Sequence, residues 1–279
     1  MYRADRVPPH AWFIVSAVFH YLGPSFAVLL FAQMQPAGVA WLRIAAAGAV
    51  FAIWRAPWRS FATMPPRERN VVTALGLVLA AMNAVFYEAI DRLPLATVGA
   101  IEFLGPIALA TYGLRSRRNL AAFVLAVAGV YVLTEVRIAG GSLGYVFAFA
   151  NCGLFMLYIV LGHRISAGNA GVDRLAVAML VATVAAMPMG LRPALPAFSN
   201  PNLLAAAIGV GISSSVIPYV CDQLAMRRLP RASFALLISV LPASAAVIGF
   251  VVLRQAPTLP ELCGILLVIG GVALHRAER

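Results

Sequence analysis

The sequence has no lysine and little charge of either sign. Its 21 basic residues are all arginine, only 10 residues are acidic, and charged residues make up 11% of the 279. An ordinary soluble domain is about 25% charged. Hydrophobic residues reach 62%, and the mean hydropathy is +0.89. A soluble fold of this length could not bury so much apolar surface, whereas a bilayer accepts it.

Cysteine and histidine are also scarce. The three cysteines each lie within an apolar run and show no CxxC spacing, which argues against disulfides and against a zinc site. The four histidines form no ligand pattern. We therefore predict no metal and no cofactor. The net charge of +11 does not indicate a nucleic-acid partner, because the arginines lie in short clusters between apolar runs.

Long apolar runs dominate the chain instead. A membrane helix needs roughly 20 apolar residues, and ten runs approach that length. They cover residues 11–31, 37–54, 70–90, 95–114, 119–134, 143–162, 175–191, 202–221, 232–253 and 259–275. The first run is long for the apolar region of a signal peptide, and further runs follow it. The sequence therefore predicts an all-α membrane protein with ten transmembrane helices and no separate soluble domain.

The arginines orient these helices in the lipid bilayer. With the N-terminus in the cytoplasm, the cytoplasmic segments hold 16 arginines, and the opposite segments hold four: Arg92, Arg137, Arg192 and Arg254. Cytoplasmic loops of membrane proteins carry the excess of positive charge. This bias predicts a multi-pass protein of the cell membrane with both termini in the cytoplasm.

A sequence repeat divides the chain in two. Residues 89–110, AIDRLPLATVGAIEFLGPIALA, align with residues 225–246, AMRRLPRASFALLISVLPASAA, at a constant offset of 136. Both stretches contain RLP and a proline twelve residues later. An odd number of helices in each half inserts the second half in the opposite sense. We predict two inverted five-helix repeats, residues 1–138 and 139–279, which is typical of secondary transporters.

Four stretches carry a resemblance to a known family. They are GVAWLRIAAAGAVF (38–51), NAVFYEAIDRLPLATVGAIEFLGPIALA (83–110), SSSVIPYVCDQLAMRRLP (213–230) and the segment 232–274. In them the chain resembles the EamA-type drug/metabolite transporter superfamily, specifically its threonine/homoserine exporter branch. The resemblance implies two EamA repeats, an inner-membrane location and proton-driven efflux of small amino-acid-like metabolites.

Two positions depart from the pattern of that family. Leu241 and Gln255 stand where its members often carry glutamates. The loss at Leu241 keeps a second function open, a non-transporting membrane scaffold or lipid-interacting protein with a degenerate second repeat. An enzyme is not expected, because HExxH, GxSxG, a paired aspartate motif and a glycine-rich phosphate loop are missing from the sequence. We expect a monomer or a homodimer.

Glu102 is the leading candidate for the functional site. It lies about eight residues into the fourth predicted span, where a charge costs about 2.5–3.5 kcal/mol on the most lenient scale. Such a carboxyl faces a cavity or a partner, and it suits proton or substrate binding as well as a structural pair. Pro106 follows one turn later, and a helix break there leaves carbonyls free for a ligand.

Arg43 is the one arginine within a predicted span. At that depth it needs an anionic partner, and three roles fit it: capture of a substrate carboxylate, pairing with Glu88 or Glu102, and snorkelling to the surface. His20 and Tyr21 in the first span fit either the lining of the same cavity or plain helix packing. Our hypothesis places Glu102 and Arg43 at one central cavity between the repeats.

The third and eighth spans, which correspond in the two repeats, supply further candidates. Asn83 and Tyr87 share one helical face and suit either a polar substrate or a bond between helices. Glu88 lies beside Asp91 and Arg92, where a rim ion pair and a substrate contact both fit.

In the second repeat, Tyr219 and Asp222 are candidates for substrate or proton binding. Asp222 equally fits a structural pair with Arg227 or Arg228 near the cytoplasmic end. Further helix breaks are predicted at Pro218 and Pro242.

Overall fold

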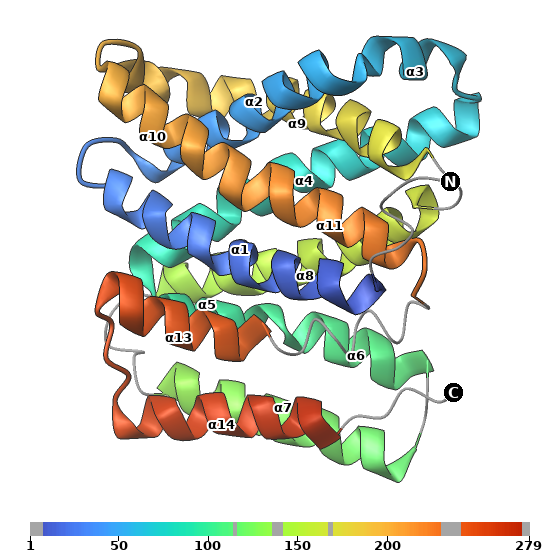
Figure 1. Cartoon of the computed structure of the whole chain (residues 1–279). Helices are drawn as coiled ribbons and strands as arrows, with labels where there is room; N and C mark the ends of the chain where they lie inside the picture. The colour runs from blue at the N-terminus through green and yellow to red at the C-terminus, as the bar shows by residue number, and fades with distance from the viewer. Residues whose placement is uncertain (1–7, 114–115, 136–141, 167–169, 230–240, 275–279) are drawn as a thin grey trace.

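The computed structural model describes residues 8–113, 116–135, 142–166, 170–229 and 241–274. Within these ranges every regular element is a helix, as predicted. They are α1 (Pro9–Leu30), α2 (Pro36–Arg55), α3 (Pro57–Thr63), α4 (Pro66–Arg92), α5 (Leu95–Glu102), α6 (Leu104–Gly113), α7 (Arg117–Glu135), α8 (Ser142–Ile165), α9 (Gly171–Phe198), α10 (Pro201–Gly211), the π-helical η3 (Ile212–Val216), α11 (Ile217–Met226), α13 (Leu241–Leu253) and α14 (Leu259–Leu274). The start of α1 and the end of α14 lie at the same end of the bundle (Figure 1).

Six helices of the described ranges are long and apolar enough to cross a membrane. They are α1, α2, α4, α8, α9 and the continuous segment of α10, η3 and α11. Shorter apolar helices occupy residues 95–108, 244–253 and 259–271. The protein is therefore a multi-pass helical membrane protein. The count of ten stays a prediction, because the fourth span is divided at Phe103 and the ninth falls partly on residues 230–240, outside the described ranges.

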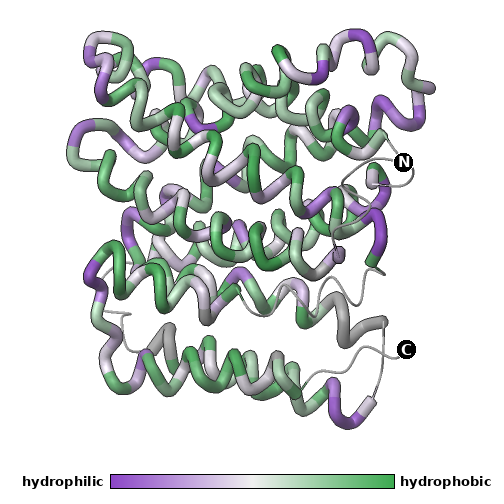
Figure 2. The backbone as a smooth tube through the Cα atoms, in the orientation of Figure 1, coloured by the Kyte–Doolittle hydropathy of each residue, from purple (hydrophilic) through white to green (hydrophobic). Residues whose placement is uncertain are grey.

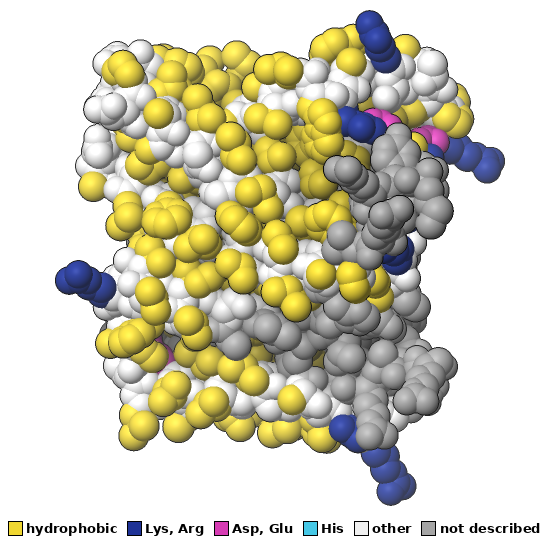
Figure 3. Space-filling view, in the orientation of Figure 1, with side chains coloured by type: hydrophobic (Ala, Val, Ile, Leu, Met, Phe, Trp, Pro, Cys, Tyr) yellow, Lys and Arg dark blue, Asp and Glu magenta, His cyan; other side chains and the backbone are white. Residues whose placement is uncertain are grey.

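The surface of the bundle agrees with a membrane location. Hydrophilic residues gather toward the two ends of the helices, and hydrophobic residues fill the middle (Figure 2). Figure 3 shows hydrophobic side chains across the visible face, with the basic side chains at its edges. Large apolar side chains such as Ile14, Val184 and Phe250 are exposed on the outside of the bundle. A bilayer would cover these side chains.

Proline sets the start of many of these helices. The first helical residue is proline in five of them: Pro9, Pro36, Pro57, Pro66 and Pro201. The missing N–H costs nothing there, and the fixed φ suits a helix. One such start, Pro57, begins the short helix α3 in a segment where the sequence predicts only a loop between spans.

Helices of the first half of the chain pack against helices of the second half. α2 packs on α9, α4 on α8, α7 on α14, α5 on α13, and α1 on η3 and α11. The α2–α9 contact is close because it is lined by glycine. A Cβ atom at Gly38 would lie 2.6 Å from the backbone carbonyl of Pro193, and one at Gly190 would lie 2.1 Å from Cβ of Trp41.

We expect Gly38→Ala to destabilise the protein. The added methyl group forces α2 and α9 apart, and overpacking of this kind costs about 1–3 kcal/mol. The matched control is Gly153→Ala in α8, where a Cβ atom meets nothing within 4 Å. Thermal unfolding of both variants in detergent measures the difference. An equal midpoint for the two variants would contradict the close contact.

Candidate functional site

Three helices meet at the carboxyl group of Glu102, which ends α5. Its Oε2 accepts a hydrogen bond from the hydroxyl of Tyr21 in α1 at 2.7 Å. Its Oε1 accepts one from Nδ2 of Asn151 in α8 at 2.9 Å. Nε2 of His20 lies 3.9 Å from Oε2. Glu102 is 2% exposed, so its polar atoms are satisfied by protein groups and not by bulk water.

Arg43 is held by neutral groups on the other side of the site. Its Nε donates to Oγ of Ser215 at 2.8 Å, and its Nη2 donates to the carbonyl of Ser214 at 2.6 Å. The guanidinium also lies over the ring of Tyr87, 5.4 Å from its centroid. Arg43 is 5% exposed, so it does not snorkel to the surface. Within the described ranges no carboxylate lies within 4.0 Å of it, which excludes a direct pair with Glu88 or Glu102 there.

Glu102 and Arg43 line the same small cavity. Its walls come from α1, α2, α4, α5, α8 and α11, and the residues that line it are His20, Pro24, Arg43, Met82, Asn83, Phe86, Glu102, Asn151 and Tyr219. The volume is about 10 Å³, which is room for about one water molecule. The cavity is therefore too small for an organic ligand in this conformation, and such a ligand would enter only after the helices move.

Three prolines weaken the helices beside this cavity. A proline has no N–H to donate to the carbonyl four residues earlier. Pro24, Pro106 and Pro218 therefore leave the carbonyls of His20, Glu102 and Ser214 without that bond. The helix is interrupted at Phe103 between α5 and α6, and η3 precedes Pro218. The carbonyl of Ser214 is the one that accepts from Arg43. The predicted break at Pro242 borders residues 230–240, outside the described ranges.

Two buried polar atoms at the site have no hydrogen-bond partner within the described part of the chain. They are the hydroxyl of Tyr87 and Oδ1 of Asn151. Buried polar atoms are nearly always bonded, so these two are available to a water molecule or a ligand. Asn83 donates to the carbonyl of Leu79 at 2.7 Å and to the hydroxyl of Tyr219 at 3.4 Å, which links α4 to α11.

Glu88 lies outside this cavity, although the sequence offered it as a site residue. Its carboxylate pairs with Arg92 one turn later at 2.6 Å, and Arg92 also lies 3.5 Å from Asp91. The side chains are partly exposed at the end of α4, so the pair is of the rim type. Its substrate role stays a prediction that the geometry does not favour.

Asp222 forms a second buried polar group near the first. Oγ of Ser16 donates to its Oδ1 at 2.5 Å, and the hydroxyl of Tyr158 donates to its Oδ2 at 2.8 Å. The carboxylate is thus held by hydroxyls and not by Arg227 or Arg228, the partners that the sequence offered. The reason is that α11 turns Asp222 inward, toward α1 and α8.

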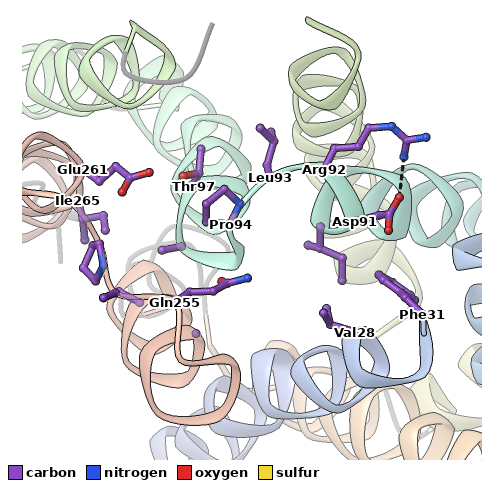
Figure 4. A pocket seen from close by; sticks show the side chains of 16 residues that line it. Val28, Phe31, Asp91, Arg92, Leu93, Pro94, Thr97, Gln255, Glu261 and Ile265 are labelled. Atoms are coloured by element: carbon purple, nitrogen blue, oxygen red, sulfur yellow. Dashed lines mark ion pairs between the residues drawn. The ribbon is translucent and has the colours of Figure 1, made fainter. Parts of the chain in front are cut away.

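The two ends of the bundle differ in how they close. A cavity of about 400 Å³ opens where α4 ends and α5 begins (Figure 4). Its polar side chains include Asp91, Arg92, Thr97, Gln255 and Glu261, and Oε1 of Gln255 accepts from the backbone N–H of Leu95 at 3.1 Å. Thr97 and Glu102 are both in α5, about 7.5 Å apart along its axis, so this vestibule lies close to the site.

Two ion pairs join α9 to α2 and α4 at the opposite end. Nη2 of Arg55 lies 2.6 Å from Oδ1 of Asp173. The neighbouring Arg174 pairs with Glu68 in the first turn of α4 and donates to the carbonyl of Ile165. Both pairs connect residues of the first half of the chain with residues of the second half.

Sequence reasoning missed several of these groups. Asn151, Tyr158 and Ser16 contact the two buried carboxylates, but each is a single polar residue in an apolar run. The signal that could have found them is spacing: Asn151 and Tyr158 are seven residues apart and lie on one face of α8.

Buried ionisable side chains enclosed by apolar helices define a class of multi-pass membrane proteins in which such groups mark solute or ion pathways. Comparison with known proteins narrows the class. The model of the EamA-like transporter family matches residues 141–276. The threonine/homoserine exporter RhtA of Salmonella typhimurium is 31% identical over 90% of this chain and 86% of that protein.

The threonine/homoserine exporter RhtA of Escherichia coli K12 is 30% identical over 85% of this chain and 80% of that protein. One crystal structure, at 18% identity, covers 95% of this chain and 96% of its own with a TM-score of 0.62, so it has the same fold. The chain belongs to the EamA-like transporter family. This membership points to a transporter and not to an enzyme.

Proposed function

We propose that this protein exports small amino acids of the threonine and homoserine type across the inner membrane by alternating access. The observation that carries the proposal is that Arg43 and Glu102 line one small cavity without pairing with each other. A zwitterionic amino acid carries one anionic and one cationic group at a short separation. The carboxylate of the amino acid would bind to Arg43, and its ammonium group would bind to Glu102 and to Oδ1 of Asn151.

The pairing of helices supports two inverted repeats, residues 1–138 and 139–279. If α1, α2, α4, α5–α6 and α7 correspond to α8, α9, α10–α11, α13 and α14, then α2–α9, α5–α13 and α7–α14 each join equivalent helices. The contact of α4 with α8 then corresponds to that of α11 with α1. Two halves that are related by a two-fold axis and have opposite orientation can exchange their conformations. This exchange converts an outward-open state into an inward-open state.

The conformation fits one step of such a cycle. The vestibule of about 400 Å³ opens at the end where Arg92 and Arg254 lie, which the arginine distribution assigns to the outside. The ion pairs of Arg55 with Asp173 and Arg174 with Glu68 close the other end, where α1 begins and α14 ends. We therefore assign this state as closed to the cytoplasm, with both termini on the cytoplasmic side.

Glu102 is suited to exchange a substrate for a proton. The Tyr21 hydroxyl donates to a carboxylate and accepts from a carboxylic acid, so the same contact serves both forms. An ammonium group and a proton would compete for this carboxyl, so acid pH would weaken the binding of substrate at Glu102. The family position occupied by Gln255 holds a neutral side chain that caps the start of α5.

The test is flux of labelled amino acids through the purified protein in lipid vesicles. Vesicles that are acidic inside should accumulate threonine and homoserine in exchange for protons, well above vesicles without protein. A panel of other amino acids and hydrophobic drugs defines the selectivity. Absence of flux for every compound would reject export and favour the scaffold.

A further inference from the structure

The carboxyl group of Asp222 is buried, bonded and without a cationic partner. It is 5% exposed, and both of its oxygens accept bonds from hydroxyl groups. Among the described residues no arginine or histidine lies within 4.0 Å of it. An ionised carboxylate in such a place is expensive unless a cation compensates it. The proposed substrate site does not use this group.

The partners of Asp222 are of the kind that tolerate a change of charge. Ser16 from α1 and Tyr158 from α8 carry hydroxyls, each able to donate to a carboxylate or to accept from a carboxylic acid. Binding of one proton by the carboxylate therefore needs only a hydroxyl rotation. The other titratable groups near Asp222 are Tyr219 and Cys221 on α11 itself, while η3 contributes neutral serines. The charged residues Asp173 and Arg174 of α9 are paired with Arg55 and Glu68.

The same two helices hold both buried carboxyl groups. α1 supplies Ser16 to Asp222 and Tyr21 to Glu102. α8 supplies Tyr158 to Asp222 and Asn151 to Glu102. Asn151 and Tyr158 are about 10.5 Å apart along the axis of α8, with Asp222 on the side where α1 begins. α1 and α8 therefore contact both buried carboxyl groups.

A third contact connects the two groups through α11. The ring of Tyr158 lies 5.4 Å from the ring of Tyr219, centroid to centroid. Tyr219 lines the central cavity and accepts from Asn83. The surroundings of Asp222 are thus in contact with the wall of the substrate site.

We propose that Asp222 is a second proton-binding site, distinct from the substrate site, and that it couples export to the proton gradient through α1 and α8. This inference rests on the proposed export of amino acids. In this coupling, Glu102 binds the substrate, and Asp222 binds the proton that crosses the membrane in the opposite direction. The cytoplasmic end of the bundle, where α1 begins, is the side to which Asp222 would release its proton.

Two assays with the full-length protein in vesicles separate these roles. Counterflow measures exchange of labelled for unlabelled threonine without a pH gradient, and gradient-driven accumulation measures coupling. For Asp222→Asn we expect counterflow within about twofold of the wild type and a loss of at least about tenfold in accumulation. Gly153→Ala in α8, where an added Cβ atom meets nothing within 4 Å, is the control and should retain both activities.

Several outcomes would overturn the proposal. Accumulation by Asp222→Asn equal to that of the wild type would do so, and so would loss of counterflow in this variant, because the carboxyl would then belong to the substrate site. If Asp222→Asn does not fold, Tyr158→Phe with Ser16→Ala keeps the carboxyl and must shift the pH dependence of accumulation. Counterflow by the wild type without accumulation in a pH gradient would reject the coupling but keep amino-acid export, whereas no flux at all would reject both.

Discussion

Glu102→Gln should lower threonine export by about 10- to 100-fold. The amide keeps the size of the side chain and its bonds to Tyr21 and Asn151 within reach, but it removes the charge that would hold an ammonium group. Hydrogen bonds to charged groups contribute about 1.5–3 kcal/mol, which corresponds to this range. The measurement is counterflow of labelled threonine in vesicles at matched protein content.

The control for that variant is again Gly153→Ala, since the added methyl group meets nothing within 4 Å. Competition adds a second readout. A 2-hydroxy acid, which lacks the ammonium group, should compete poorly with threonine in the wild type. The proposed role of Glu102 is excluded if Glu102→Gln exports threonine at the wild-type rate.

Arg43→Ala should raise the KM for threonine by at least about tenfold. Arg43 is the cation that faces the cavity, and it is held by Ser214, Ser215 and Tyr87 without a carboxylate partner. Loss of one partner of a buried charged contact costs about 2–5 kcal/mol. Arg43→Lys should keep part of the affinity, because the charge remains while the fork that holds Ser214 and Ser215 is lost.

Substrate chemistry distinguishes this role from a merely structural one. An amino alcohol in which the carboxylate of threonine is replaced by CH₂OH should inhibit the wild type poorly. In Arg43→Ala the amino alcohol and threonine should inhibit equally, because no cation remains to tell them apart. If the variant folds and still prefers threonine, Arg43 is structural and another group binds the carboxylate.

Hydropathy along the chain was sufficient to predict the class of fold and to identify two residues of the central cavity. Charge is so costly in an apolar span that Glu102 and Arg43 stand out from their neighbours. The effect of proline can also be predicted from the sequence, because its missing N–H leaves the carbonyl four residues earlier in the same helix without a hydrogen bond. The interruption at Phe103 and the π-helical turn before Pro218 agree with this local rule, whereas α1 and α9 continue through their interior prolines.

The hydrogen-bond partners of these residues could not be predicted from the sequence. Arg43 bonds to Ser214, 171 residues away, and Glu102 bonds to Tyr21 and Asn151, 81 and 49 residues away. A serine or an asparagine in an apolar helix has the same local pattern whether it faces a cavity, a neighbouring helix or its own backbone. Glu88 and Asp222 show the same limit: both lie near helix ends, yet one pairs with Arg92 at the rim and the other turns inward.

The sequence by itself determined that the chain lies in a membrane and that two opposite charges are buried among its helices. Those properties depend on composition and on neighbours along one helix. Only the tertiary structure decided that Arg43 and Glu102 share a cavity, that Asp222 is bonded by α1 and α8, and which end of the bundle is closed. These depend on how helices far apart in the chain pack together, and close packing is set by side-chain shapes that a linear pattern does not record.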